Sequence, residues 1–278
     1  AEARADLASI WGTDPLPAAR GRDTTEILIA ARDGELAGLL VGGVDPGDLP
    51  DPLLAEAALD NAGFVVSLEL LPSAVTARAD VVLPVAPMQE KAGTYVDWEG
   101  RLRSFDTTLR GTGALSDGRI LDTIAADLGV DLGTAHVESV HVEWSRLGPI
   151  VTPRPKPPVV TAGRPGAARK GEAVLATWHW LLDEGTLQRG EPHLAGTAKR
   201  SRVLLSAATA ADIGAAESDE VTVSTDRGSV TLPLVIADLP DRVVWLPTRS
   251  AGSAVRRALG ADNGAIVRIA AAGKAGAE

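Results

Sequence analysis

The apolar residues divide the chain into a part with alternating strand and helix patterns and a later part rich in strands. Short, continuous apolar runs recur in the first 130 residues. Such runs are typical of strands that are buried on both faces of a parallel sheet. The predicted strands are residues 26–30, 36–42, 64–68 and 80–84. The pattern predicts an α/β fold with right-handed crossovers for this part.

Helix signals lie between and after these strands. Asp51 is a good N-cap, and Pro52 suits the first position of a helix. Residues 72–79 predict a short helix, and residues 88–103 predict a loop. A further amphipathic helix runs from Ile120 to Leu128 and is closed by a glycine.

From residue 201 onward the sequence is rich in predicted strands, and apolar residues alternate with polar ones at 221–223 and 230–236. The predicted elements are a helix at 207–213 and strands at 221–223, 230–236, 242–246 and 265–269. Asp226-Arg227-Gly228 predicts a three-residue hairpin loop with left-handed glycine. Pro233 predicts an edge or a bulge, because proline donates no hydrogen bond to a ladder. Together these elements predict a small barrel.

A proline-rich stretch separates the two parts. Six prolines fall among residues 149–165, and proline both fixes φ and removes a donor. The predicted domains are 1–148, a linker at 149–200 and a barrel domain at 201–278. The linker is predicted to contain one helix, over residues 172–182.

Charge and composition narrow the possible functions. The chain has 278 residues, with 27 Lys+Arg against 37 Asp+Glu. Residues 1–143 have a net charge of −14 and residues 144–200 one of +5, so the acidic half argues against nucleic-acid binding. The absence of cysteine excludes disulfides, thiolate iron–sulfur clusters and cysteine-ligated zinc within these residues. The basic middle is interpreted as a solvated linker or as a strap on an acidic surface.

Few residues have the spacing of a catalytic motif. Glu90, Asp97 and Glu99 are acidic residues of one loop, next to basic residues. Catalytic carboxylate pairs usually come from separate segments on two sides of a cleft, so local ion pairs are favoured here. Gly42-Gly43 favours a tight turn over a dinucleotide site, because it lacks the full glycine spacing. The four histidines show no zinc-protease pattern.

Two stretches resemble the molybdopterin oxidoreductase superfamily. One joins residues 79–84 (ADVVLP) to residues 90–101 (EKAGTYVDWEGR), and the other comprises residues 211–215, 219–223 and 227–230. The resemblance implies a Rossmann-like parallel sheet portion, followed by a small double-psi β-barrel of the molybdopterin-dinucleotide-binding type. Asp97 stands where the superfamily usually has Asn.

Residues 98–101 (WEGR) are most similar to the G-subunit family of bacterial NADH-quinone oxidoreductase, respiratory complex I. The resemblance implies a C-terminal scaffold segment of the complex, with no catalytic, cofactor-binding or metal-binding residues of its own. Glu90, Gly93, Thr94, Asp97, Glu99 and Arg101 would then be a vestigial motif with a structural role.

The same resemblance implies a setting for the segment. The 4Fe-4S and 2Fe-2S clusters would lie in the rest of the subunit. The partners would be the N-terminal part of the subunit and other subunits of the peripheral arm, on the cytoplasmic side of the plasma membrane but without contact to it. Two alternatives remain open: a fragment of a working molybdopterin enzyme of the formate dehydrogenase or nitrate reductase type, and an unrelated small-molecule-binding α/β protein.

Overall fold

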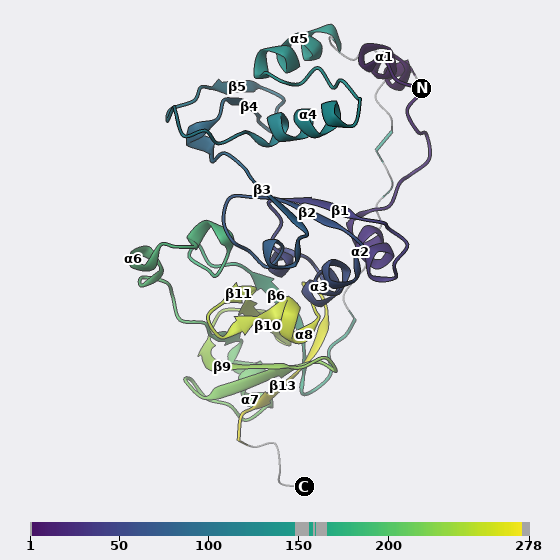
Figure 1. The fold of residues 1–278 in the computed structure, drawn as a ribbon. Helices are drawn as coiled ribbons and strands as arrows, with labels where there is room; N and C mark the ends of the chain where they lie inside the picture. Colours follow the sequence, from purple (N-terminus) through teal and green to yellow (C-terminus); the bar gives the residue numbers. More distant parts are fainter. Residues whose placement is uncertain (1, 148–155, 158, 160–165, 274–278) are drawn as a thin grey trace. The chain divides into compact units, whose positions relative to one another are not determined.

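The computed structural model describes residues 2–147, 156–157, 159 and 166–273 (Figure 1). The chain forms two compact units. Unit 1 comprises Ala1–Val44 and Ala58–Val159, and unit 2 comprises Asp45–Ala57 and Val160–Glu278. The segment Asp45–Ala57 therefore interrupts unit 1 in the sequence and belongs to unit 2. The proline-rich boundary lies almost entirely outside the described residues.

Unit 1 contains a three-stranded parallel sheet in the order β1-β2-β3. Its strands are β1 (Leu39–Gly42), β2 (Val65–Glu69) and β3 (Val81–Pro84). The sheet confirms three of the four strands predicted for this part. The other elements of the unit are α1 (Glu2–Trp11), α2 (Thr24–Arg32), η2 (Thr76–Arg78), η3 (Met88–Glu90), β4 (Gly93–Val96), β5 (Leu102–Phe105), α4 (Asp117–Asp127) and α5 (Val137–Leu147).

The strand predicted at residues 26–30 is wrong, because this run lies inside helix α2. Asp23 is the N-cap: its carboxylate accepts from the Glu26 amide at 3.0 Å. The Glu26 carboxylate accepts in return from the Asp23 amide at 2.7 Å. This reciprocal capping box satisfies two amides that a helix start leaves without partners. The box therefore favours a helix over a buried strand for the apolar run that follows.

The loop predicted at residues 88–103 is also wrong in part. Residues 93–105 form the antiparallel hairpin β4–β5, with Gly93 opposite Phe105 and Val96 opposite Leu102. A β-carbon at Gly93 would lie 2.7 Å from the Phe105 ring, so glycine lets that ring lie across the strand. Tyr95 packs on the same ring, with centroids 5.1 Å apart. These contacts across the hairpin stabilise it.

Unit 2 is built on a closed barrel with the strand order β10-β6-β13-β8-β9-β7. A mixed α/β fold with a closed six-stranded barrel is therefore confirmed. The barrel strands are β6 (Glu172–Trp178), β7 (Val203–Leu205), β8 (Glu220–Ser224), β9 (Ser229–Ile236), β10 (Val243–Pro247) and β13 (Ile266–Ala271). The other elements are η1 (Pro46–Asp48), η4 (Thr186–Gln188), α6 (Pro192–Ala195), α7 (Ala207–Asp212), β11 (Arg249–Ser250), β12 (Ser253–Ala254) and α8 (Val255–Leu259). Helix α3 (Pro52–Asn61) begins in this unit and ends in unit 1.

The helix predicted at residues 172–182 is wrong, because residues 172–178 form strand β6. Ala173, Leu175 and Thr177 are buried, while the residues between them are not, which is the period of a strand. β6 pairs with β10 in parallel and with β13 antiparallel, so its apolar face closes the barrel. These long-range pairings outweigh the weak helical spacing.

The hairpin between β8 and β9 also differs from the prediction. Ser224 is opposite Ser229, so the loop has four residues, 225–228, and not three. The φ of Gly228 is not positive, so the prediction of a left-handed glycine is wrong. Pro233 pairs with Glu220 of β8 and precedes the residues of β9 that pair with β7. Proline is tolerated there because no ladder on the β7 side needs its missing donor.

Candidate functional site

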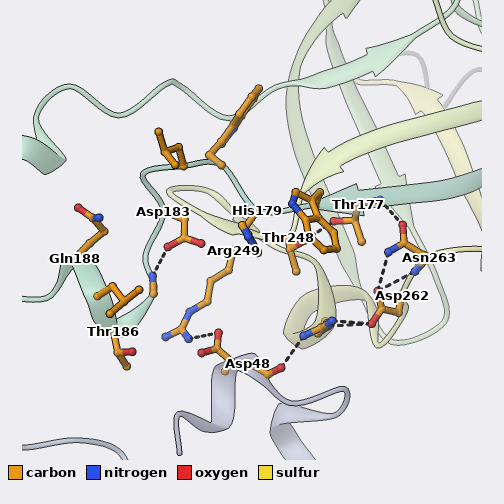
Figure 2. A pocket seen from close by; sticks show the side chains of 17 residues that line it. Asp48, Thr177, His179, Asp183, Thr186, Gln188, Thr248, Arg249, Asp262 and Asn263 are labelled. Carbon is orange, nitrogen blue, oxygen red and sulfur yellow. Dashed lines mark hydrogen bonds and ion pairs between the residues drawn. The ribbon is translucent and has the colours of Figure 1, made fainter. Parts of the chain in front are cut away.

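A pocket of about 590 Å³ opens beside the barrel in unit 2 (Figure 2). Its walls come from the chain after β6, from the turn after β10, from the segment 262–263 and from η1. The lining residues with polar side chains include Asp48, Thr177, His179, Asp183, Gln188, Thr248, Arg249, Arg256, Asp262 and Asn263. The volume is in the range of small-molecule sites.

The polar groups at the barrel side of the pocket bind one another. Asn263 Oδ1 accepts from the Thr177 amide at 2.7 Å. The Thr177 hydroxyl lies 2.9 Å from the Leu246 carbonyl oxygen and 2.8 Å from the Thr248 hydroxyl. Thr177 is buried, and burying such a group costs little when its hydrogen bonds are made. This wall therefore has internal partners for its donors and acceptors.

Both guanidinium groups of the pocket are engaged by carboxylates. Arg249 Nη1 lies 2.8 Å from Asp45 Oδ2 and 3.0 Å from Asp48 Oδ1. Burial lowers the pKa of Arg249, but the hydrogen bonds and charges of these two aspartates outweigh it, so its pKa is raised. Arg256 lies 3.0 Å from Asp262 Oδ2 and also donates to the Asp48 carbonyl oxygen at 2.6 Å.

These contacts belong to a longer row of ion pairs between the segment 45–57 and the barrel. Arg227 donates two hydrogen bonds, of 3.1 and 3.0 Å, to the two oxygens of Asp51. Arg257 pairs with Glu56. The row therefore holds η1 and the start of α3 with arginines from the last 52 residues of the chain. Sequence reasoning missed this arrangement, and its only trace in the sequence is the acidic charge of residues 1–143.

We expect the Asp51–Arg227 pair to make a small favourable contribution to the free energy of unfolding, because both side chains are partly exposed and water screens their charges. The test is a double-mutant cycle with Asp51→Asn and Arg227→Gln, measured by urea unfolding at low salt. Asn preserves the cap that Asp51 provides to the Leu53 and Leu54 amides, so the cycle isolates the charge. The matched control is the Asp226–Arg268 pair, whose side chains are 97% and 57% exposed and should show weaker coupling.

The coupling should also depend on pH. Arg227 lowers the pKa of Asp51 first through its hydrogen bonds, and two backbone amides lower it further. The contribution is therefore complete above the unfolded pKa of about 3.9 and is lost as the pH falls through the lower folded value. Coupling that persists unchanged at a pH well below the folded value would contradict an ion pair.

The six residues predicted to be a vestigial motif lie in and next to the β4–β5 hairpin of unit 1. Thr94 Oγ1 is 2.7 Å from His141 Nε2 of α5 and 3.3 Å from Ser104 Oγ. Glu90 lies in η3, before the hairpin, and Gly93 is the first residue of β4. The remaining three, Asp97, Glu99 and Arg101, form the turn. The structure therefore divides the motif between the packed base and the exposed turn of the hairpin.

The turn is held by its own polar groups. Asp97 Oδ1 accepts from the amides of Glu99 and Arg101, each at 2.9 Å. Glu99 forms an ion pair with Arg101. At the base, Lys91 pairs with Asp117 at 2.7 Å, beside a second pocket of about 700 Å³ that Glu90, Gly93 and Thr94 also line. The two acidic side chains of the turn thus have local cationic or amide partners, as expected for a structural loop.

Other kinds of site find no support in the described residues. Within the part of the chain that the structure describes, no group of three or more His, Cys, Asp or Glu side chains is placed to hold a metal ion. In the same residues, no helix is long and apolar enough to cross a membrane.

Two family models match the chain. Residues 8–117 match the molybdopterin oxidoreductase model, and residues 177–273 match the model of the molybdopterin dinucleotide binding domain. The G subunit of NADH-quinone oxidoreductase from Mycobacterium bovis is 54% identical over 97% of this chain. The chain spans only 34% of the length of that relative.

Two further likenesses are weaker. A putative formate dehydrogenase of Staphylococcus aureus is 32% identical over 47% of this chain and 13% of its own length. Among solved structures, acetylene hydratase from Pelobacter acetylenicus has a TM-score of 0.59 at 13% identity, with 97% of this chain and 49% of that chain covered. This last likeness shows a shared fold.

The second family model implies a dinucleotide, and the charges of the unit 2 pocket decide whether such a group fits there. Three carboxylates, of Asp48, Asp183 and Asp262, line it against two guanidiniums that already have anionic partners. Phosphates are usually bound by uncompensated Arg or Lys or by free amides at a helix start. Two wall atoms, Trp180 Nε1 and Gln188 Oε1, have no hydrogen-bond partner, but protein atoms cover both. The lining does not fit a phosphate-bearing cofactor.

Proposed function

Because the chain belongs to the molybdopterin oxidoreductase family, we propose that it is a C-terminal scaffold segment of the G subunit of NADH-quinone oxidoreductase and carries no redox chemistry itself. The observation that carries the proposal is the acidic pocket: the arginines that a phosphate would need are bound by Asp45, Asp48 and Asp262. The sheet of unit 1 is proposed to be the remnant of the family's Rossmann-like domain.

The proposal includes a division of labour in the whole subunit. Electrons from NADH would pass to quinone through 4Fe-4S and 2Fe-2S clusters held outside these residues, since a cluster needs cysteine ligands and this chain has none. The segment would brace that part of the subunit and contact other subunits of the peripheral arm. The complex would be attached to the plasma membrane, with this segment on the cytoplasmic side and without membrane contact.

Pterin analysis of the purified complex tests the proposal. We expect acid extraction to release no stoichiometric pterin and metal analysis to find iron without molybdenum, because both arginines of the pocket are already bound by carboxylates. The control is a molybdopterin enzyme carried through the same extraction. One pterin and one molybdenum per complex would instead favour the alternative, a fragment of a molybdopterin-dependent oxidoreductase of the formate dehydrogenase or nitrate reductase type. The partial match to the putative formate dehydrogenase supports this alternative.

A further inference from the structure

The turn of the β4–β5 hairpin places a tryptophan in solvent. Trp98 is 93% exposed, and Val96 and Leu102, which face each other at the turn end of the hairpin, are 52% and 48% exposed. An exposed cluster of large apolar side chains is more informative than single exposed ones, because it marks an interaction surface. Tryptophan is also among the residue types that most often dominate the binding energy of protein interfaces.

The turn that carries Trp98 is rigidly built. The Asp97 carboxylate fixes the amides of Glu99 and Arg101, and the Asp97 amide donates to the Arg101 carbonyl at 3.1 Å. The Gly100 amide closes the turn by donating to the Asp97 carbonyl at 2.9 Å. A loop whose backbone is already ordered loses less entropy when it binds. Asp97 therefore orders the loop that presents the indole.

The charges around Trp98 indicate what kind of surface would cover it. Glu99 and Arg101 pair with each other, and the Asp97 carboxylate is used by backbone amides. Because these charges are compensated inside the turn, we expect a partner surface to bind the turn through its apolar side chains. The complementary surface is then an apolar pocket with one hydrogen-bond acceptor for the indole N–H, since a buried tryptophan usually finds such a partner.

In the described part of unit 1, the hairpin is exposed at its turn end. β4 and β5 form a sheet of two strands only, next to α4 and α5 (Figure 1). A two-stranded sheet is marginally stable in water unless it packs on another element. The base of the hairpin is packed, through Thr94 and His141 and through Gly93 and Phe105, whereas the end with Trp98 is not. Additional packing is therefore expected at the turn and not at the base.

We infer that Trp98 is the anchor of a docking surface, and that its occupant is an apolar pocket on the remaining part of the same subunit. The G-subunit relative carries about two-thirds of its length outside the region that matches this chain. A surface on the same polypeptide is present at a high effective concentration, which favours it over a separate protein. The inference rests on the proposed function, because it requires that longer subunit.

Photo-crosslinking in the purified NADH-quinone oxidoreductase complex identifies the occupant. With Trp98→p-benzoylphenylalanine, we expect one crosslinked peptide from the same polypeptide, outside the residues of this chain. The control is the same substitution at Leu128, which is 76% exposed in the same unit and should give little crosslinking. A crosslink to another subunit or to a second copy, or a yield no higher than at Leu128, would overturn the inference.

Limited trypsin digestion of the complex measures the docking itself. Docking protects the peptide bond after Arg101, and loss of an anchor residue weakens docking by about 30-fold or more. We therefore expect Trp98→Ala to raise the cleavage rate there by about that factor, and Trp98→Phe to raise it much less. An equal acceleration after Arg119 of α4 would indicate opening of the whole unit and contradict the inference. These readouts are independent of pterin content, so the proposed function and this inference can fail separately.

Discussion

Leu246→Ala should lower the free energy of unfolding by about 2–5 kcal/mol. Leu246 is completely buried in β10 and belongs to the apolar cluster that fills the barrel, together with Leu175 and Leu205. β10 pairs with both β6 and β7, so the strand has little freedom to move into the space that the substitution leaves. The loss therefore combines the transfer of the side chain with an uncollapsed cavity.

Urea unfolding of the variant and of Ile236→Ala tests this prediction. Ile236 lies in β9 of the same barrel but is 40% exposed, so its truncation should cost clearly less. Equal costs for the two variants would show that the barrel interior is not the stabilising core of unit 2.

Gly228→Ala should destabilise the protein by about 1–3 kcal/mol through a steric clash. A β-carbon at Gly228 would lie 2.6 Å from the Ala258 carbonyl oxygen. The obstacle is backbone at the end of α8, which cannot rotate away as a side chain would. Because the φ of Gly228 is not positive, the cost comes from this close approach and not from backbone strain.

The matched control for this substitution is Gly118→Ala in α4. A β-carbon at Gly118 meets nothing within 4 Å, and alanine is the better helix former, so this variant should be neutral or more stable. Thermal unfolding compares the two variants directly. If Gly228→Ala unfolded at the same temperature as Gly118→Ala, the hairpin would not approach α8 as described.

Local signals in the sequence predicted several elements correctly. Asp51 and Pro52 predicted the start of α3, the alternation of apolar residues predicted β8 and β9, and the apolar run at 242–246 predicted β10. Two elements were predicted wrongly because another interaction outweighs the local apolar pattern. In α2 this interaction is the capping box. In β6 it is the pairing with β10 and β13, whose residues lie more than 65 positions away in the sequence.

The site depends even more on contacts that no local pattern contains. The motif residues were recognised from residues 90–101, but the pairing that makes Asp97 part of a turn appears only in the folded hairpin. The Arg249 guanidinium meets Asp45 and Asp48, which lie about two hundred positions earlier in the chain. Charge counts indicated that the first half of the chain is acidic, but they did not indicate which arginines its carboxylates bind. The pairing of individual charges needs the three-dimensional structure.

If this segment supports the complex without taking part in its chemistry, a variant of it should change the amount of complex and not the turnover of each complex. Arg249→Gln removes a cation from the pocket of unit 2, so Asp48 loses its ion pair and Asp45 keeps only the longer one with Arg189, at 3.8 Å. We predict that the variant reduces the amount of assembled NADH-quinone oxidoreductase, while kcat for NADH-to-quinone electron transfer, normalised to complex by its iron content, equals that of the wild type. A fully assembled variant complex with a clearly lower kcat would contradict a purely supporting role for this segment.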